Sequence, residues 1–194
     1  MNQFYIARHG ETENNRARRL SGWADTPLTE NGLEPTKSVI EKLRDISIDD
    51  MYSSDLGRAI KTAEGIAKGL GFTKQIIQLF GLREVSYGKA ANMQSDEAYK
   101  LYPGLDSDTH FIPPGGESLE HMQSRVFATI NELNDKHDDS NILLVCHSGV
   151  MAAIRSSHIG QDFGAHNISE AYPHDYVAKF SIEDNIIRSF EELK

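Results

Sequence analysis

The sequence has little of what marks several classes of protein. Cys146 is the single cysteine among 194 residues, so no disulfide can form within the chain and no thiolate metal site can be assembled. No apolar run approaches the roughly 20 residues that span a bilayer. The N-terminal residues show no basic segment followed by a long apolar stretch, so a cleaved signal peptide is not expected. These absences predict a cytoplasmic protein with no membrane partner.

Positive charge is also scarce. The chain has 20 Lys and Arg residues against 29 Asp and Glu residues, which gives a formal net charge of −9. An acidic surface disfavours nucleic acid and anionic membranes as partners. It does not disfavour a small anionic substrate, because a local group of arginines can override the overall charge. The length predicts a single domain over 1–194, and the aperiodic segment at about 90–116 predicts a lid or specificity insertion.

Hydrophobic patterning predicts alternating strands and helices. Strands are expected at 4–7, 51–54, 75–79 and 141–146, and helices at 33–43, 55–70, 95–101, 117–136 and from 150. Ser54 or Asp55 is the expected N-cap of the second helix, and Gly71 its stop. Thr29 is a plausible N-cap for the first helix, although Pro35 indicates a later start or a kink. The alternating residues at 176–180 and 186–190 predict an antiparallel hairpin at a sheet edge, where a homodimer could form.

Two predicted strands end in the same way. The run 4–7 leads into Arg8, His9 and Gly10, and the run 141–146 leads into His147, followed by Ser148 and a glycine. In open α/β sheets, ligands bind at the carboxyl ends of the strands. The repeated pattern therefore places two imidazoles and a guanidinium at one candidate binding edge.

The polar residues expected at this edge suit phosphoryl chemistry. Arg8 and Arg58 offer forked donors that fit a tetrahedral dianion. One histidine, kept neutral, can attack phosphorus, and the other, if protonated, can add positive charge to the transferring group. Glu84 can protonate the leaving oxygen and later deprotonate water. This chemistry requires no metal.

The remaining histidines and a basic loop carry weaker signals. The other histidines show no metal-ligand spacing and are assigned to the surface or to packing: His110, His121, His137, His158, His166 and His174. Of these, His110 lies in the predicted insertion. Arg16, Arg18 and Arg19 could meet a carboxylate or second phosphate beyond the reacting group, or could be solvated loop residues.

Taken together, these motifs resemble a known family. Arg8-His9-Gly10-Glu11-Thr12 with Asn15 is similar to the signature of the histidine phosphatase superfamily, which includes the cofactor-dependent phosphoglycerate mutases. Further similar segments follow in the family's order: 21–23, 53–59, 82–84, 115–118 and 145–149. The resemblance covers nearly the whole chain. It implies a three-layer α/β/α sandwich around a mostly parallel central sheet.

The resemblance also implies roles for individual residues. His9 would be the nucleophile that becomes a phosphohistidine, and Glu84 the proton donor. Four side chains would bind the phosphoryl group, with Asn15 alternatively orienting His9. Ser21 and Gly22, from the loop that resembles the family's, and Ser148, where a glycine is frequent, would be further phosphate or substrate contacts. The four phosphoryl-binding side chains are Arg8, Arg58, His147 and Asn15.

Three functions remain open from the sequence. The favoured one is a metal-independent phosphomonoesterase that acts on a small phosphorylated metabolite, releases inorganic phosphate and needs no cofactor. A cofactor-dependent phosphoglycerate mutase shares the same groups, but mutases of this family are typically longer, and 90–116 has few cations. A non-catalytic phosphate-binding or interaction module would need the arginines but no acid/base. The segment 88–92 lacks the Trp and Glu that many relatives carry there, which bears on substrate specificity.

Overall fold

The central element of the computed structural model is one six-stranded sheet. The structure describes residues 1–105, 107–160 and 172–194, so His166 lies outside it. The strand order is β3-β2-β4-β1-β5-β6. The strands span Gln3–Arg8 (β1), Asp50–Ser54 (β2), Ile77–Leu79 (β3), Asn141–Cys146 (β4), Val177–Glu183 (β5) and Ile186–Glu192 (β6). Strands β3, β2, β4 and β1 are mutually parallel, and the β5–β6 hairpin adds antiparallel strands beside β1.

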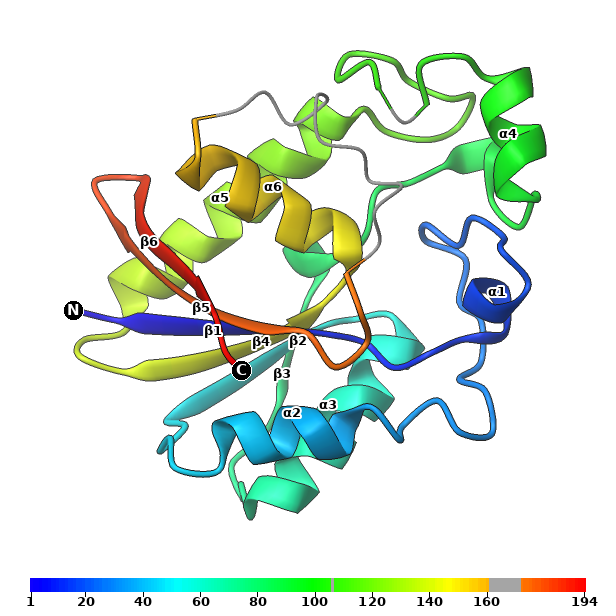
Figure 1. Ribbon diagram of the computed structural model, residues 1–194. Helices are drawn as coiled ribbons and strands as arrows, with labels where there is room; N and C mark the ends of the chain where they lie inside the picture. Colours follow the sequence, from blue (N-terminus) through cyan, green and yellow to red (C-terminus); the bar gives the residue numbers. More distant parts are fainter. Residues whose placement is uncertain (106, 161–171) are drawn as a thin grey trace.

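Helices cover both faces of the sheet and make the predicted three layers (Figure 1). Helices α2 (Thr36–Leu43) and α3 (Gly57–Leu70) pack on one face, where Val39, Ile66 and Leu143 are fully buried. Helices α5 (Leu119–Lys136) and α6 (Ser148–His158) cover the other. Apolar residues at three- and four-residue steps give α2, α3 and α5 one buried stripe each, whereas α6 is buried on nearly all sides. The three-layer, mostly parallel α/β/α fold is confirmed.

The connections differ from the sequence prediction in three places. A short helix α1 (Glu13–Arg16) follows the first strand, and Thr12 caps it in a capping box with Asn15. Helix α2 starts only after Pro35, so Thr29 is not its N-cap. Helix α3 begins after Leu56 with no side-chain cap, so the predicted caps at residues 54 and 55 are wrong. The Asp55 carboxylate instead accepts two hydrogen bonds from Arg83, at 2.6 and 2.8 Å.

The segment between β3 and α5 is irregular but contains short helices. They are η1 (Phe80–Leu82), η2 (Gly88–Ala90) and α4 (Ser95–Leu101), the last with its predicted bounds. Strand β6 forms one edge of the sheet and β3 the other. The predicted hairpin is confirmed as β5–β6, at the edge formed by β6. A homodimer through this hairpin stays a prediction.

Candidate active site

The two histidines of the repeated strand-end pattern lie side by side. Strands β1 and β4 are paired in register from Gln3 and Asn141 to Arg8 and Cys146. The backbone N–H of His9 donates to the Cys146 carbonyl over 3.0 Å, which carries the ladder one step further. The rings of His9 and His147 consequently lie 5.1 Å apart, centroid to centroid.

His9 is held as a neutral imidazole with one unprotonated ring nitrogen. Its side chain is buried, and Nδ1 donates to the Gly10 carbonyl over 2.7 Å, which leaves the lone pair on Nε2. Arg58 Nε lies 3.3 Å from that Nε2. Burial, then the charges of Arg58 and Arg8, hold the pKa of His9 well below its usual value. The imidazole is therefore unprotonated at neutral pH and can act as a nucleophile through Nε2.

Glycine is needed at position 10 for a close backbone approach. A Cβ there would lie 2.1 Å from the carbonyl oxygen of Gly32, which no real side chain tolerates. The Gly10 N–H also donates to the hydroxyl oxygen of Thr62, from α3, over 2.9 Å. These contacts tie the turn after His9 to the loop before α2 and to helix α3.

Two buried guanidinium groups flank His9. Arg58, in the first turn of α3, donates to the carbonyls of Gly22 at 2.7 Å and Ala24 at 3.0 Å. Arg8 donates to the Tyr172 carbonyl, and its Nε has no hydrogen-bond partner within the described parts of the chain. Burial lowers the pKa of Arg8 to about 10, so it stays charged at neutral pH. A buried cation with an unused donor is suited to an anionic ligand.

His147 is more deeply buried than His9. It has no exposed surface, and neither ring nitrogen has a hydrogen-bond partner among residues that the structure describes. Burial, followed by the charge of Arg58, lowers the pKa of His147 well below its usual value. The imidazole is thus neutral without a ligand. A bound dianion would raise that pKa, so the protonated form predicted from the sequence requires an occupied site.

Glu84 reaches the same place from the segment between η1 and η2. Its carboxylate accepts from the backbone N–H of Gly149 at 3.1 Å and of Val85 at 3.0 Å. Gly149 lies in the first turn of α6, where unpaired N–H groups favour a carboxylate. A Cβ at position 149 would lie 2.1 Å from Glu84 Oε1, so the carboxylate occupies the space that a side chain would fill.

The remaining predicted contacts have different local roles. The side-chain oxygen Oδ1 of Asn15 accepts from the backbone N–H and hydroxyl of Thr12 at 3.0 and 2.8 Å, so Asn15 orders the loop and makes no hydrogen bond to His9. Ser21 Oγ is buried and unpartnered among the described residues. Ser148 Oγ accepts from a backbone N–H, that of Tyr172, at 3.0 Å.

A cavity of about 590 Å³ is lined by most of these groups, but the buried His147 is not among its lining residues. Segment 90–116 contributes four lining residues, which are three residues of α4 and the residue just before that helix. The basic loop contributes Arg18 and Arg19 but not Arg16. His110 is exposed and faces Glu120 instead. The lining residues are Arg8, His9, Glu11, Asn15, Arg18, Arg19, Leu20, Ser21, Gly22, Arg58, Glu84, Tyr87, Gln94, Ser95, Asp96, Tyr99, Ser148 and His174.

His174 is a residue in contact with His9 that the sequence reasoning did not assign to the site. Its Nδ1 donates to the His9 carbonyl over 2.6 Å, and the two rings lie 5.7 Å apart. The assignment of His174 to the surface or to packing is therefore wrong. Burial, then the charge of Arg8, lowers the pKa of His174 to about 4. No sequence motif predicts this contact, because it joins residues that are 165 positions apart in the chain.

Within the described ranges, no group of three or more His, Cys, Asp or Glu side chains is placed to hold a metal ion. Among the described residues, no helix is both long enough and apolar enough to cross a membrane.

Comparison with known proteins identifies the family. A profile of the histidine phosphatase superfamily (branch 1) matches residues 4–179. The chain belongs to this superfamily. It is 34% identical over 165 residues to a protein named probable phosphoglycerate mutase GpmB from Salmonella typhi, which covers 82% of this chain and 76% of the relative.

Solved structures share the fold. YhfR from Bacillus stearothermophilus superposes with a TM-score of 0.84 at 26% identity, covering 97% of this chain and 95% of that one. A mycobacterial glucosyl-3-phosphoglycerate phosphatase gives a TM-score of 0.83 at 24% identity, covering 99% and 97%. A protein named as a phosphatase thus shares this fold, and a sequence relative is named as a mutase.

Proposed function

We propose that the protein is a metal-independent phosphomonoesterase that hydrolyses a small phosphorylated metabolite through a phosphohistidine on His9. The observation that carries the proposal is the state of His9. It is neutral, its unprotonated Nε2 accepts a hydrogen bond from Arg58 Nε over 3.3 Å, and Glu84 reaches the same cavity. A binding module would have no use for a nucleophile and an acid/base held together in this way.

The reaction has two steps. In the first, His9 Nε2 attacks phosphorus, the bond between phosphorus and the ester oxygen breaks, and Glu84 supplies the proton to that oxygen. Arg8 and Arg58 neutralise the charge on the phosphoryl oxygens during transfer. In the second, Glu84 takes a proton from water, the water oxygen attacks phosphorus, and the nitrogen–phosphorus bond breaks. Inorganic phosphate leaves and His9 is again neutral.

Around the phosphoryl group, Ser21 and the first turn of α6 offer further donors. Ser21 Oγ is buried, lines the cavity and has no partner in the described structure. The backbone of Ser148 begins α6 at the cavity wall, and a helix N-terminus favours an anion. Beyond the reacting group, Arg18, Arg19 and residues 94–99 would contact the rest of the substrate. A role of segment 90–116 as a lid is part of this proposal.

A phosphoglycerate mutase is the second candidate, because the relative that is 34% identical carries that name. A mutase must hold a bisphosphorylated intermediate while it reorients and must exclude water from the phosphohistidine. Phosphatase and mutase share His9, Glu84 and the arginines, so the geometry of these groups does not separate them.

The test is phosphate release from a panel of small phosphomonoesters, with EDTA present, for the wild type and His9→Ala. Release by the wild type alone, with an acid-labile phosphoprotein trapped on quenching, supports the proposal. Isomerisation of 3-phosphoglycerate in the presence of 2,3-bisphosphoglycerate, with no net phosphate release, supports the mutase. Equal phosphate binding by both proteins with no turnover of any substrate supports a binding module.

A further inference from the structure

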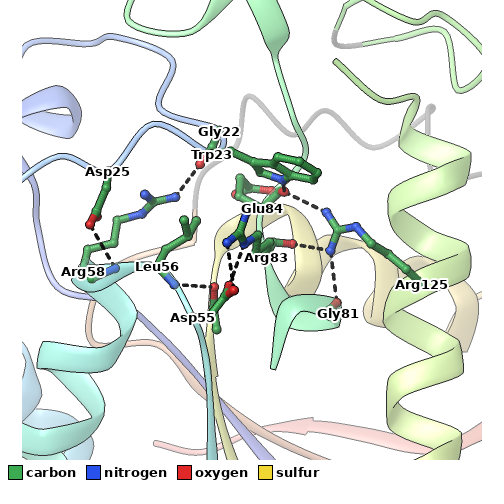
Figure 2. Close-up of polar contacts among 12 residues, drawn as sticks. Gly22, Trp23, Asp25, Asp55, Leu56, Arg58, Gly81, Arg83, Glu84 and Arg125 are labelled. Atoms are coloured by element: carbon green, nitrogen blue, oxygen red, sulfur yellow. Dashed lines mark hydrogen bonds and ion pairs between the residues drawn. The ribbon is translucent and has the colours of Figure 1, made fainter. Parts of the chain in front are cut away.

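The backbone carbonyl of Glu84 receives two side-chain hydrogen bonds from distant parts of the chain. Trp23 donates its indole N–H over 2.7 Å, and Arg125 donates a guanidinium N–H over 2.8 Å. Figure 2 shows the two donors meeting at Glu84, with Arg125 extending from helix α5. Two donors on one carbonyl fix the backbone from which the carboxylate extends. Neither donor lines the cavity.

Arg125 holds more of this segment than one carbonyl. Its Nη1 also donates to the carbonyls of Gly81 at 3.1 Å and Arg83 at 2.8 Å (Figure 2). It pairs through Nη2 and Nε with Glu117 at 2.5 and 3.1 Å, and the same carboxylate accepts from the Ser86 N–H at 3.0 Å. The side chains of Arg125 and Glu117 are only 15% and 14% exposed. One mostly buried ion pair therefore fixes backbone from residue 81 to residue 86.

Trp23 connects this segment to the phosphoryl-binding side of the site. Arg58 donates to the carbonyls immediately before and after it, at Gly22 and Ala24. Gly22 has a φ of 52°, and a Cβ there would lie 2.8 Å from the Val85 carbonyl oxygen. The loop therefore lies directly against the residues that follow Glu84. Only glycine allows this approach at that backbone conformation.

The indole itself is fixed by packing. Its ring meets the Phe80 ring edge-on, with centroids 5.3 Å apart. The Arg83 guanidinium lies 5.2 Å from the Trp23 ring centre and 4.9 Å from that of Phe80, while its nitrogens are bound to Asp55. A cation over an aromatic face and an edge-on ring pair both restrict the orientation of the indole N–H.

We propose that Trp23 and Arg125 are positioning residues that set where the Glu84 carboxylate stands relative to His9. The inference rests on the proposed function, in which Glu84 is the acid and base. Because the Trp23 loop is held by Arg58, the acid/base and the phosphoryl group are placed by one connected set of contacts. A misplacement of about 1 Å in a catalytic group can cost about 10²-fold in rate.

The dependence on the leaving group tests this role. A nitrophenolate leaves without protonation, whereas the alkoxide of a primary alcohol needs the Glu84 proton. In Arg125→Met we expect kcat/KM for a primary-alcohol phosphate to fall about 100-fold, and in Trp23→Phe about tenfold, with less than about a threefold change for nitrophenyl phosphate. Glu84→Gln should show the same selectivity more strongly. Trp23→Phe keeps an aromatic ring and removes the indole N–H.

Tyr52→Phe is the matched control. It also removes one side-chain hydrogen bond of an aromatic residue, the 2.7 Å contact between the Tyr52 hydroxyl and His137 in another part of the fold. We expect it to leave the ratio of the two kcat/KM values unchanged. Thermal melting of each variant reports the folded fraction separately.

A second readout follows the hydrolysis of the phosphohistidine. Because Glu84 also activates water, the positioning variants should release a burst of nitrophenolate equal to the enzyme concentration and then turn over slowly. Equal losses on both substrates with a reduced burst would indicate a purely structural role and overturn the inference, as would wild-type values throughout. A wild type that turns over neither substrate would overturn the proposed function, and the inference with it.

Discussion

The proposed nucleophile and the proposed acid/base stand in two regions built by different means. His9 and His147 directly follow β1 and β4, so the hydrogen bonds of a parallel ladder set their separation. Glu84 lies in an irregular stretch that joins no strand ladder, between η1 and η2. Its place is set by the Arg125 and Trp23 side chains and by the N–H of a residue in α6.

The difference shows which part of the site tolerates change. A ladder of backbone hydrogen bonds depends on the apolar runs that form the strands, and few single substitutions remove it. A set of side-chain contacts depends on each member, because removing one leaves buried polar groups without partners. We therefore expect the position of the nucleophile to be robust and the position of the acid/base to be sensitive to substitutions far from the cavity.

The largest expected effect separates the two regions chemically. His9→Gln should lower kcat/KM by about 10⁴-fold or more for every phosphomonoester, since no other group replaces the attacking nitrogen. Glu84→Gln should lower it about 10²–10⁴-fold for alkyl phosphates and much less for nitrophenyl phosphate. Steady-state kinetics on both substrate types checks this. Equal losses on both substrates in Glu84→Gln would mean that Glu84 does not protonate the leaving group.

The same contrast explains what the sequence could predict. The run at 141–146 is a continuous apolar stretch, and the strand has the predicted bounds because it is buried on both faces. The pattern of a strand followed by histidine and glycine is local in sequence, so it located His9 and His147. The predicted cap at Asp55 failed because a tertiary partner, Arg83, took its carboxylate.

Contacts between distant segments could not be predicted in this way. Nothing in the sequence around Trp23 or Arg125 indicates that both donate to the carbonyl of Glu84, which lies 61 and 41 positions away. His174 likewise lies in the turn before β5, and the position of this turn in the fold brings its ring to the His9 carbonyl. Such pairings depend on how the layers stack, which hydrophobic periodicity does not specify.

Gly149, two residues after His147, donates its N–H to the Glu84 carboxylate and so links the two regions. Gly149→Ala should displace that carboxylate. The added methyl group would lie 2.1 Å from Glu84 Oε1, so the carboxylate must move. We expect about a 100-fold loss of kcat/KM on alkyl phosphates and about 1–3 kcal/mol of lost stability from overpacking. Gly65→Ala in α3 is the control, since its nearest neighbours lie 3.9 Å away and a helical alanine is favoured. Unchanged activity in Gly149→Ala would show that Glu84 need not stand where the structure has it.

The protonation of His147, beside His9, should depend on whether an anion is bound. A bound dianion raises the lowered pKa of His147, so anion binding takes up a proton and affinity increases as pH falls. Sulfate keeps the same charge from pH 5 to 8, and Glu84→Gln removes the carboxyl to which the proposed mechanism assigns a proton. In the Glu84→Gln variant, we expect the sulfate dissociation constant to fall by up to about tenfold for each unit by which the pH is lowered. Isothermal titration across this range, with Glu84→Gln/His147→Asn as the control, checks it; a flat profile in the parent variant would mean that His147 stays neutral.

The smallest expected effect concerns His174, which ties the C-terminal part of the chain to the His9 backbone. Its pKa is lowered to about 4 in the folded protein, against about 6.5 in the unfolded chain. Above pH 6.5 it is neutral in both states, and between pH 6.5 and 4 only the unfolded chain takes up the proton, so stability is lost as pH falls. His174→Asn should cost about 1 kcal/mol at pH 8, where only the hydrogen bond is weakened, and should lose less stability on acidification than the wild type.

Urea unfolding of His174→Asn and the wild type between pH 8 and 4 would measure both effects. His110→Asn shows what removing an exposed imidazole does by itself. The burial that lowers the pKa of His9 and His147 leaves an acid sensitivity of the same sign in every variant, so the two curves should converge but not become flat. Parallel curves would mean that His174 titrates alike in the folded and unfolded chains. In that case the contact with His9 would hold the backbone without excluding water from the ring.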